Sequence, residues 1–314
     1  MATQTVHVAN IANMASYTPA ETIELMSRVG AKRGRMRPDK IFLSAVSSGC
    51  LVSFASAAAL TATAAPWLQE NAPGIVKMIS GLVFPSGIVM ILPWISVVIE
   101  WLLILRNRLS GGELFTGSNM ALQVTRVWIL TQRADGGVFD HSPYRDQAIA
   151  NAKQKQVDLQ FHQIFLRAIG CNWLVCLACY LGLQAKDLTS KVVGMWWPIF
   201  AFVTLGLEHV VANMFFIPMG LFLGTPGLTI PLYIWKGIIP ATIGNILGGA
   251  GFCGAFYYWL HIFDEPEICV DGTYYQRLEE GTLFGSTVVV DTGSDKDGSS
   301  SGDVAENENN AKVD

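Results

Sequence analysis

Long runs of apolar residues are the feature that most limits how this chain can fold. They cover residues 41–65, 74–105, 161–184, 192–223 and 231–262. A transmembrane helix needs about 20 mostly apolar residues, and each run is at least that long. Because only helices and closed barrels satisfy their backbone hydrogen bonds inside a membrane, runs of this length favour helices. The chain is therefore predicted to be an all-α polytopic membrane protein.

The composition supports a membrane protein. Hydrophobic residues make up 51% of the 314 residues and charged residues only 15%, proportions unlike those of ordinary soluble domains. The formal net charge of −4 conceals a basic cluster before the first run, formed by Lys32, Arg33, Arg35, Arg37 and Lys40. The positive-inside rule then places the N-terminus in the cytoplasm. We expect no signal peptide, no nucleic-acid partner and targeting by the first span.

Three regions follow from the pattern of apolar and polar residues. Residues 1–39 form a cytosolic N-terminal segment, residues 40–262 the transmembrane domain, and residues 263–314 a cytosolic tail. Asp, Glu, Ser, Gly and Asn dominate the tail from about residue 291, a composition typical of disorder. The polar segment 132–160 cannot cross a membrane as a helix.

The six cysteines do not suggest a cofactor. Most lie inside apolar runs, where a free thiol behaves as a small hydrophobic group. Cys176 and Cys179 have CxxC spacing, but this pair stands alone in a predicted span. We therefore expect no disulfide framework, no metal site and no cofactor.

The stretch "TLGLEHVVANMFF" places Glu208, His209 and Asn213 within the run 192–223. This run is longer than one span needs, so we predict two half-helices on either side of a break. A helix can break within a membrane only where protein or a water-filled cavity supplies hydrogen-bond partners. The second half-helix would then direct unpaired N–H groups towards an anion. Histidine is the side chain here that could change charge near neutral pH, so we expect His209 to donate a hydrogen bond or a proton to the anion.

A second polar interruption resembles the first. "GELFTGSNM" places Asn119 six residues after Glu113, and "GLEHVVANM" places Asn213 five residues after Glu208. Transporters are often built from two repeats whose broken helices meet near the middle of the membrane. The alternative is that these polar side chains only join helices. Intramembrane ionisable residues more often serve function, so we favour a functional site.

Several motifs together resemble the formate/nitrite transporter family of anion permeases. They are "GELFTG" (112–117), "CNWLVCLA" (171–178), "LEHVVANMFFIPMG" (207–220) and "GNILGGA" (244–250). "APWLQENAPG" (65–74) is similar to the nitrite-transporter branch of filamentous fungi. The resemblance covers most of residues 40–262.

The resemblance implies a homopentamer in the plasma membrane, with both termini in the cytoplasm. Each protomer would have its own pore and an aquaporin-like bundle of six spans in inverted repeats. The function implied is transport and not enzymatic catalysis. The substrate would be a small monovalent weak-acid anion, nitrite first and formate or another short monocarboxylate as the alternative, linked to protons through a pore histidine.

The resemblance also assigns roles to residues. His209 would be the central histidine, Thr116 the threonine of the first broken loop and Asn172 the asparagine of the fourth span. Glu208 and Asn213, next to the break, complete the expected substrate-binding group. Leu114, Phe115 and Phe202 are expected to form the hydrophobic constrictions of the pore. The vestibule lysine of the family aligns with Gln156, so we assign its role to the adjacent Lys155.

The chain departs from the family pattern in two places. Residues 92–109 intervene before the first broken loop, and the apolar segment 120–130 is about half as long as a third span requires. One hypothesis is that the extra segment replaces the missing span. The other is an unusual splice form or gene-model variant that does not transport.

Three further functions stay open as alternatives. One is an aquaporin-like channel for neutral solutes, because that fold also uses broken half-helices. Another is an intramembrane enzyme that uses Glu208 and His209 as acid and base. It ranks last, because no nucleophile motif or HExxH pattern accompanies these residues. The third is a transport-dead subunit that only assembles with other subunits.

Overall fold

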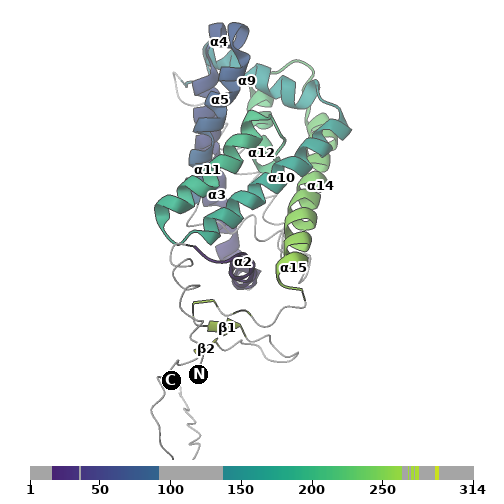
Figure 1. The fold of residues 1–314 in the computed structure, drawn as a ribbon. Helices are drawn as coiled ribbons and strands as arrows, with labels where there is room; N and C mark the ends of the chain where they lie inside the picture. The colour runs from purple at the N-terminus through teal and green to yellow at the C-terminus, as the bar shows by residue number, and fades with distance from the viewer. Residues whose placement is uncertain are drawn as a thin grey trace, which may run out of the picture.

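The computed structural model is an elongated bundle of helices (Figure 1). It describes residues 16–34, 37–91 and 137–263, together with the short pieces 268, 270–271, 273–275 and 287–289. Several predictions concern residues outside this part of the chain. They are the sites at Leu114, Phe115 and Thr116, the segments 92–109 and 120–130, and the disordered tail from 291.

The helices of the N-terminal half begin at proline residues. They are α2 (Pro19–Gly34), α3 (Pro38–Thr63), α4 (Pro66–Asn71), α5 (Pro73–Val83) and α6 (Pro85–Ile91). Proline suits the first position of a helix, because its φ is already helical and the N–H it lacks would have no partner there. The prolines therefore divide the apolar sequence into separate helices. The run that begins at residue 74 forms α5 and α6, which meet at Phe84 and Pro85.

The second half of the chain holds the longer apolar helices. They are α9 (Tyr144–Ala152), its π-helical continuation η2 (Lys153–Val157), α10 (Phe161–Gln184), α11 (Leu188–Thr204) and α12 (Val210–Phe222). A final helical segment alternates between α and π geometry through α13 (Ile230–Leu232), η3 (Tyr233–Ile238), α14 (Ile239–Ile246), η4 (Leu247–Ala255) and α15 (Phe256–His261). Asp187 caps α11, since its Oδ1 accepts a hydrogen bond of 2.9 Å from the amide of Ser190.

The prediction of an all-α membrane protein is confirmed. Within the described residues, Pro73–Met90, Phe161–Gln184 and Ile230–His261 are long and apolar enough to cross a membrane, and Ser47–Thr63 and Val210–Phe222 are shorter apolar helices. The strands of the described part are short: β1 (Thr273–Tyr275) pairs antiparallel with β2 (Thr287–Val289), with Thr273 opposite Val289. They follow the last helix and leave the bundle entirely helical.

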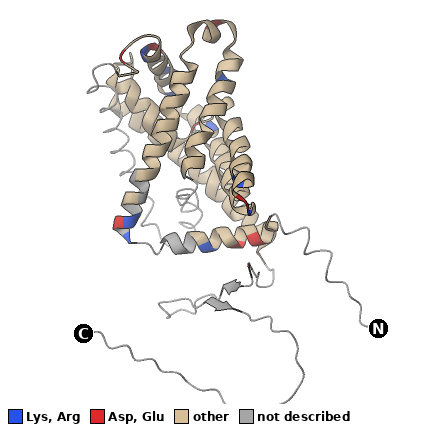
Figure 2. Ribbon diagram, turned by 90° about the vertical axis from the view of Figure 1, so that its left-hand side faces the viewer, with Lys and Arg blue, Asp and Glu red and all other residues tan. Residues whose placement is uncertain are grey.

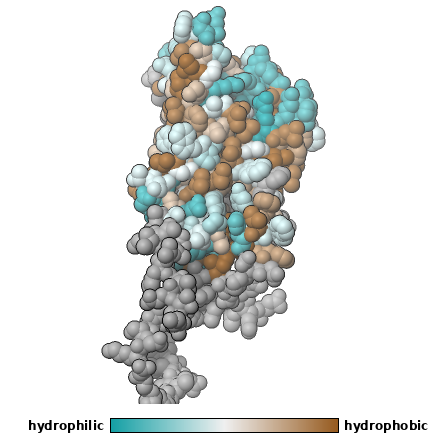
Figure 3. Space-filling model, in the orientation of Figure 1, coloured by the Kyte–Doolittle hydropathy of each residue, from teal (hydrophilic) through white to brown (hydrophobic). Residues whose placement is uncertain are grey.

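Charge and hydropathy divide the bundle along its length. Lys, Arg, Asp and Glu gather towards its two ends (Figure 2). Hydrophobic residues form much of the outer surface between them, and hydrophilic residues gather at the end where α4 and α9 lie (Figure 3). We call this the α4 end, and the opposite end the α2 end. An apolar surface between charged ends is what a bilayer requires.

Helix α2 lies across the α2 end of the bundle (Figure 1). Tyr17, two residues before the helix, donates a hydrogen bond of 2.6 Å from its hydroxyl to Oδ2 of Asp271. This bond, together with partial burial and the nearby negative charge, raises the pKa of Tyr17 to about 12. The contact joins the segment before α2 to the chain that follows α15.

Glycines allow the last helical segment to pack closely against α10. A Cβ atom at Gly248 would overlap the carbonyl oxygen of Ile169, and one at Gly244 would lie 2.5 Å from the carbonyl oxygen of Phe165. Gly251 has a different environment, since a Cβ there would meet no atom within 4 Å. Gly224 also faces open space, and its φ of +76° shows that it serves a turn. Close helix packing therefore explains Gly244 and Gly248 but not Gly224 or Gly251.

Replacing Gly248 with alanine is expected to destabilise the protein by about 1–3 kcal/mol, the usual penalty of overpacking. The matched control is Gly251→Ala, which adds the same methyl group to the same π-helical segment without a clash. Thermal unfolding of the purified protein in detergent would compare the two variants. Equal unfolding temperatures for the two variants would show that α10 and η4 can move apart without loss of stability.

Candidate functional site

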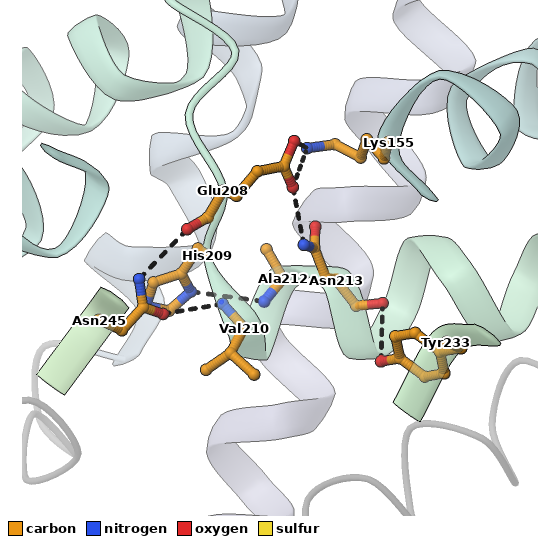
Figure 4. Close-up of polar contacts among 8 residues, drawn as sticks. All are labelled: Lys155, Glu208, His209, Val210, Ala212, Asn213, Tyr233 and Asn245. Carbon is orange, nitrogen blue, oxygen red and sulfur yellow. Dashed lines mark hydrogen bonds and ion pairs between the residues drawn. The ribbon is translucent and has the colours of Figure 1, made fainter. Parts of the chain in front are cut away.

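The helix break predicted within 192–223 is confirmed. Helix α11 ends at Thr204, α12 begins at Val210, and residues 205–209 connect them without helical structure. Gly206 has a φ of +68°, a left-handed conformation that glycine adopts without strain. The break runs from the exposed Leu205 to the buried Glu208, and it turns His209 and Glu208 towards different neighbours (Figure 4).

His209 is the N-cap residue of α12. Its Nδ1 accepts a hydrogen bond of 3.4 Å from the amide of Ala212. Since Nδ1 is an acceptor, the neutral ring carries its hydrogen on Nε2. Within the described part of the chain, no hydrogen bond involves Nε2, which is therefore a free donor. His209 also lines the cavity described below.

The start of α12 differs from our expectation of unpaired amides. The amide of Val210 donates to Oδ1 of Asn245 at 2.9 Å, and that of Ala212 donates to His209. These two N–H groups cannot also bind an anion. The helix dipole still favours negative charge here, but the imidazole replaces the amides as the available donor.

Glu208 is a buried carboxylate with three polar contacts. Its side chain is 1% exposed, and Nζ of Lys155 lies 3.1 Å from both carboxylate oxygens. Nδ2 of Asn213 donates to Oε2 of the same group at 2.7 Å. A buried charge is tolerated when it is paired and hydrogen-bonded in this way. Glu208 therefore joins the break to η2 and to the second turn of α12 (Figure 4).

Asn245 holds the backbone of the break, a role that we did not predict. Its Nδ2 donates to the carbonyl oxygens of Ala168 at 2.8 Å and Glu208 at 3.2 Å, while its Oδ1 accepts from Val210. Asn172 in turn donates to the backbone oxygen of Asn245 at 2.7 Å. Asn245 lies in the "GNILGGA" motif, where a polar residue in an apolar run was the available signal.

Aromatic rings lie next to the imidazole. The ring centroids of Phe202 and His209 are 6.2 Å apart, and Phe84 packs edge-on against Phe202 at 5.8 Å. Phe216 stacks on Phe84 at 6.4 Å. Phe202 was expected near the pore from the sequence, whereas Phe84 and Phe216 were not. Phe216 follows His209 by two helical turns, a spacing that places both residues on one face of α12.

A cavity of about 230 Å³ brings several predicted residues together. His209, Glu208, Phe202 and Lys155 all line it, whereas Asn172 and Asn213 are not among its lining residues. The role of Lys155 as the vestibule lysine stays a prediction. Gln156, by contrast, is 1% exposed and donates to the carbonyl oxygen of Leu232. The cavity walls come from α3, α5, α9, η2, α10, α11, the break and α12.

Comparison with known proteins agrees with this architecture. A sequence model described as formate/nitrite transporter matches residues 20–96 and 114–259, more than half of the chain. The chain belongs to the formate/nitrite transporter family. Such a family consists of membrane transporters and channels, so the expectation of a transport protein and not an enzyme is confirmed. Residues 97–113 fall between the two matched stretches and overlap the predicted insertion at 92–109.

Relatives in this family resemble the chain over most of its length. It is 30% identical over 284 residues to a probable formate transporter of Methanothermobacter thermautotrophicus, covering 78% of this chain and 97% of that protein. It is 30% identical over 270 residues to a formate channel of Bacillus thuringiensis, covering 78% and 96% of the two chains. A solved pentameric formate channel with formate bound has a TM-score of 0.61 at 26% identity, covering 72% of this chain and 98% of that one.

Proposed function

We propose that this member of the formate/nitrite transporter family carries nitrite together with protons through a pore centred on His209. The observation that carries the proposal is the position of this residue. Its imidazole begins a half-helix, faces a cavity and keeps a free Nε2–H donor. In the proposal, five such chains form a homopentamer in the plasma membrane, each with its own pore and with both termini in the cytoplasm.

The chemistry follows from the apolar surroundings of the imidazole. An unpaired anion is expensive in a low-dielectric passage, whereas a neutral weak acid is not. Phe84, Phe202 and Phe216 form an apolar wall beside His209, and such constrictions exclude water and ions. The Nε2–H of His209 would donate a hydrogen bond that holds the anion in the cavity. A proton from the acidic outside solution, carried by water in the cavity, then converts the anion to the neutral acid that passes the aromatic wall.

The remaining predicted residues receive more specific roles in this proposal. Glu208 and Asn213 hold the break in place, because the carboxylate of Glu208 binds both Asn213 and Lys155. Asn172 supports Asn245 and through it the start of α12. Thr116, Leu114 and Phe115 stay predictions for the other wall of the pore.

Formate is the second candidate substrate. The relatives compared above are described as formate transporters and formate channels, whereas the preference for nitrite comes from the resemblance at residues 65–74. Both anions are small, monovalent and conjugate bases of weak acids. The pore chemistry proposed for His209 is therefore the same for both.

Uptake into proteoliposomes at different outside pH values tests the function. We expect nitrite uptake to rise as outside pH falls, in proportion to the supply of protons. Nitrate should not enter at a comparable rate, because it is the anion of a strong acid and cannot cross as a neutral acid. Formate measured in parallel decides between the two candidate substrates.

Protein-free liposomes are the necessary control, since small neutral acids also cross lipid. The proposal fails if the protein adds no uptake of nitrite or formate to that background. Uptake of nitrate equal to that of nitrite, or uptake independent of pH, would contradict the weak-acid mechanism.

A further inference from the structure

The cavity that His209 lines carries more positive than negative charge among its described lining residues. Lys77 of α5, Lys155 of η2 and Arg167 of α10 line it, and Glu208 is the one acidic residue among its lining residues. Clefts lined by one sign of charge concentrate ions of the opposite sign. The question is which of the three cations attracts an entering anion.

Lys155 is poorly suited to this role. Its ammonium group lies 3.1 Å from both oxygens of Glu208 and 5.8 Å from the centre of the Phe216 ring. Two opposite charges at this distance act on a third as a dipole, whose field falls off faster than that of a single charge. The positive charge of Lys155 is thus used to neutralise the buried Glu208.

Among the described residues, Lys77 and Arg167 have no such partner. In the part of the chain that the structure describes, neither makes an ion pair or a hydrogen bond through its side chain. Both lie close to the α4 end, about one turn inside α5 and about two turns inside α10 respectively. Lys77 shares its face of α5 with Ser80 and Phe84, which also line the cavity.

We propose that Lys77 and Arg167 bind the entering anion at the mouth of the cavity, and that Lys155 serves to compensate Glu208. The anion is held before it reaches His209, and its local concentration rises there. Ser80 and Phe84 then continue the wall of α5 from the charged mouth towards the aromatic rings. The identity of the anion rests on the proposed function, whereas the capture site rests on the charges alone.

The double variant Lys77→Gln/Arg167→Gln tests this site. At subsaturating nitrite and low salt we expect the initial uptake rate to fall about tenfold, the lower end of electrostatic steering by a charged cleft. The difference should largely disappear near 1 M salt, where the Debye length shrinks to about 3 Å. At saturating nitrite the maximal rate should change little, because His209 is intact.

Lys40→Gln is the matched control, since it removes one exposed charge near the start of α3, at the α2 end. Its uptake should equal that of the parent. An unchanged salt dependence in the double variant, or the same loss at every salt concentration, would overturn the proposal. In either case transport by the parent protein would leave the proposed function standing.

Iodide provides a readout that does not depend on transport. In crystals soaked with iodide, anomalous density is expected beside Lys77 or Arg167 in the parent and should be absent in the double variant. Density next to Lys155 instead, or no density at the mouth, would overturn the assignment. This result decides the capture site even if the parent carries neither nitrite nor formate.

Discussion

His209→Ala is expected to lower pH-stimulated nitrite uptake by about 100-fold, the lower end of the effect of removing one hydrogen-bond donor that stabilises a charged group. The variant removes the Nε2–H donor from the cavity, so nothing would hold the anion beside the aromatic wall while it takes up a proton from solution. Initial rates in proteoliposomes at acidic outside pH measure the effect. Alanine also removes the N-cap of α12, a loss of about 1 kcal/mol in stability.

His209→Asn separates these two effects. Asparagine is a strong N-cap residue, so its side chain can still accept from the amide of Ala212. With Oδ1 as the cap, the shorter amide side chain places no N–H donor at the position of Nε2. We expect the thermal stability of the parent together with the transport defect of His209→Ala. If nitrite uptake by His209→Asn equals that of the parent at acidic pH, His209 serves only as a structural cap. That result would favour a channel for neutral solutes.

Lys155→Gln is expected to cause the largest loss of stability, about 3–5 kcal/mol, which is typical of breaking a buried ion pair from one side. The reason is that Glu208, with a side chain only 1% exposed, would keep its charge without a counter-ion. Its contact with Asn213 supplies one hydrogen bond but no opposite charge. Thermal unfolding in detergent, combined with size-exclusion chromatography, measures the loss.

The double variant Lys155→Gln/Glu208→Gln supplies the control for this prediction. A neutral amide at position 208 can still accept from Asn213 and can bond to the glutamine at position 155. The double variant should therefore regain much of the stability that Lys155→Gln loses. If the double variant is less stable than Lys155→Gln, the effects come from packing and not from an uncompensated charge.

The sequence predicted the helices well, because each is determined by local properties. The run 161–184 became α10 with the same limits, and the run 231–262 became the helical segment from Ile230 to His261. The break was also predictable, since Glu208 and His209 interrupt a run that is longer than one span. The "LEHVVANMFFIPMG" and "GNILGGA" motifs indicated the family that the sequence comparison then showed.

The contacts between site residues were harder to predict from the sequence. Lys155 and Glu208 are 53 residues apart, and nothing in their local sequence says that they meet. The prediction that free amides of α12 would face the anion was wrong for Val210 and Ala212, because Asn245 and His209 already accept from them. The contribution of Lys77 to the cavity likewise required the packed arrangement of α5 against α11.

What the sequence alone determined is thus the membrane character, the helix limits, the break and the family, since each depends on residues that are close together in the chain. What the tertiary structure decided is which charges are compensated. Whether a lysine attracts an anion or neutralises a neighbour depends on the few ångströms between atoms on different helices. Helix packing sets such separations. The close approach of η4 to α10, for example, depends on the absence of a Cβ atom at Gly248.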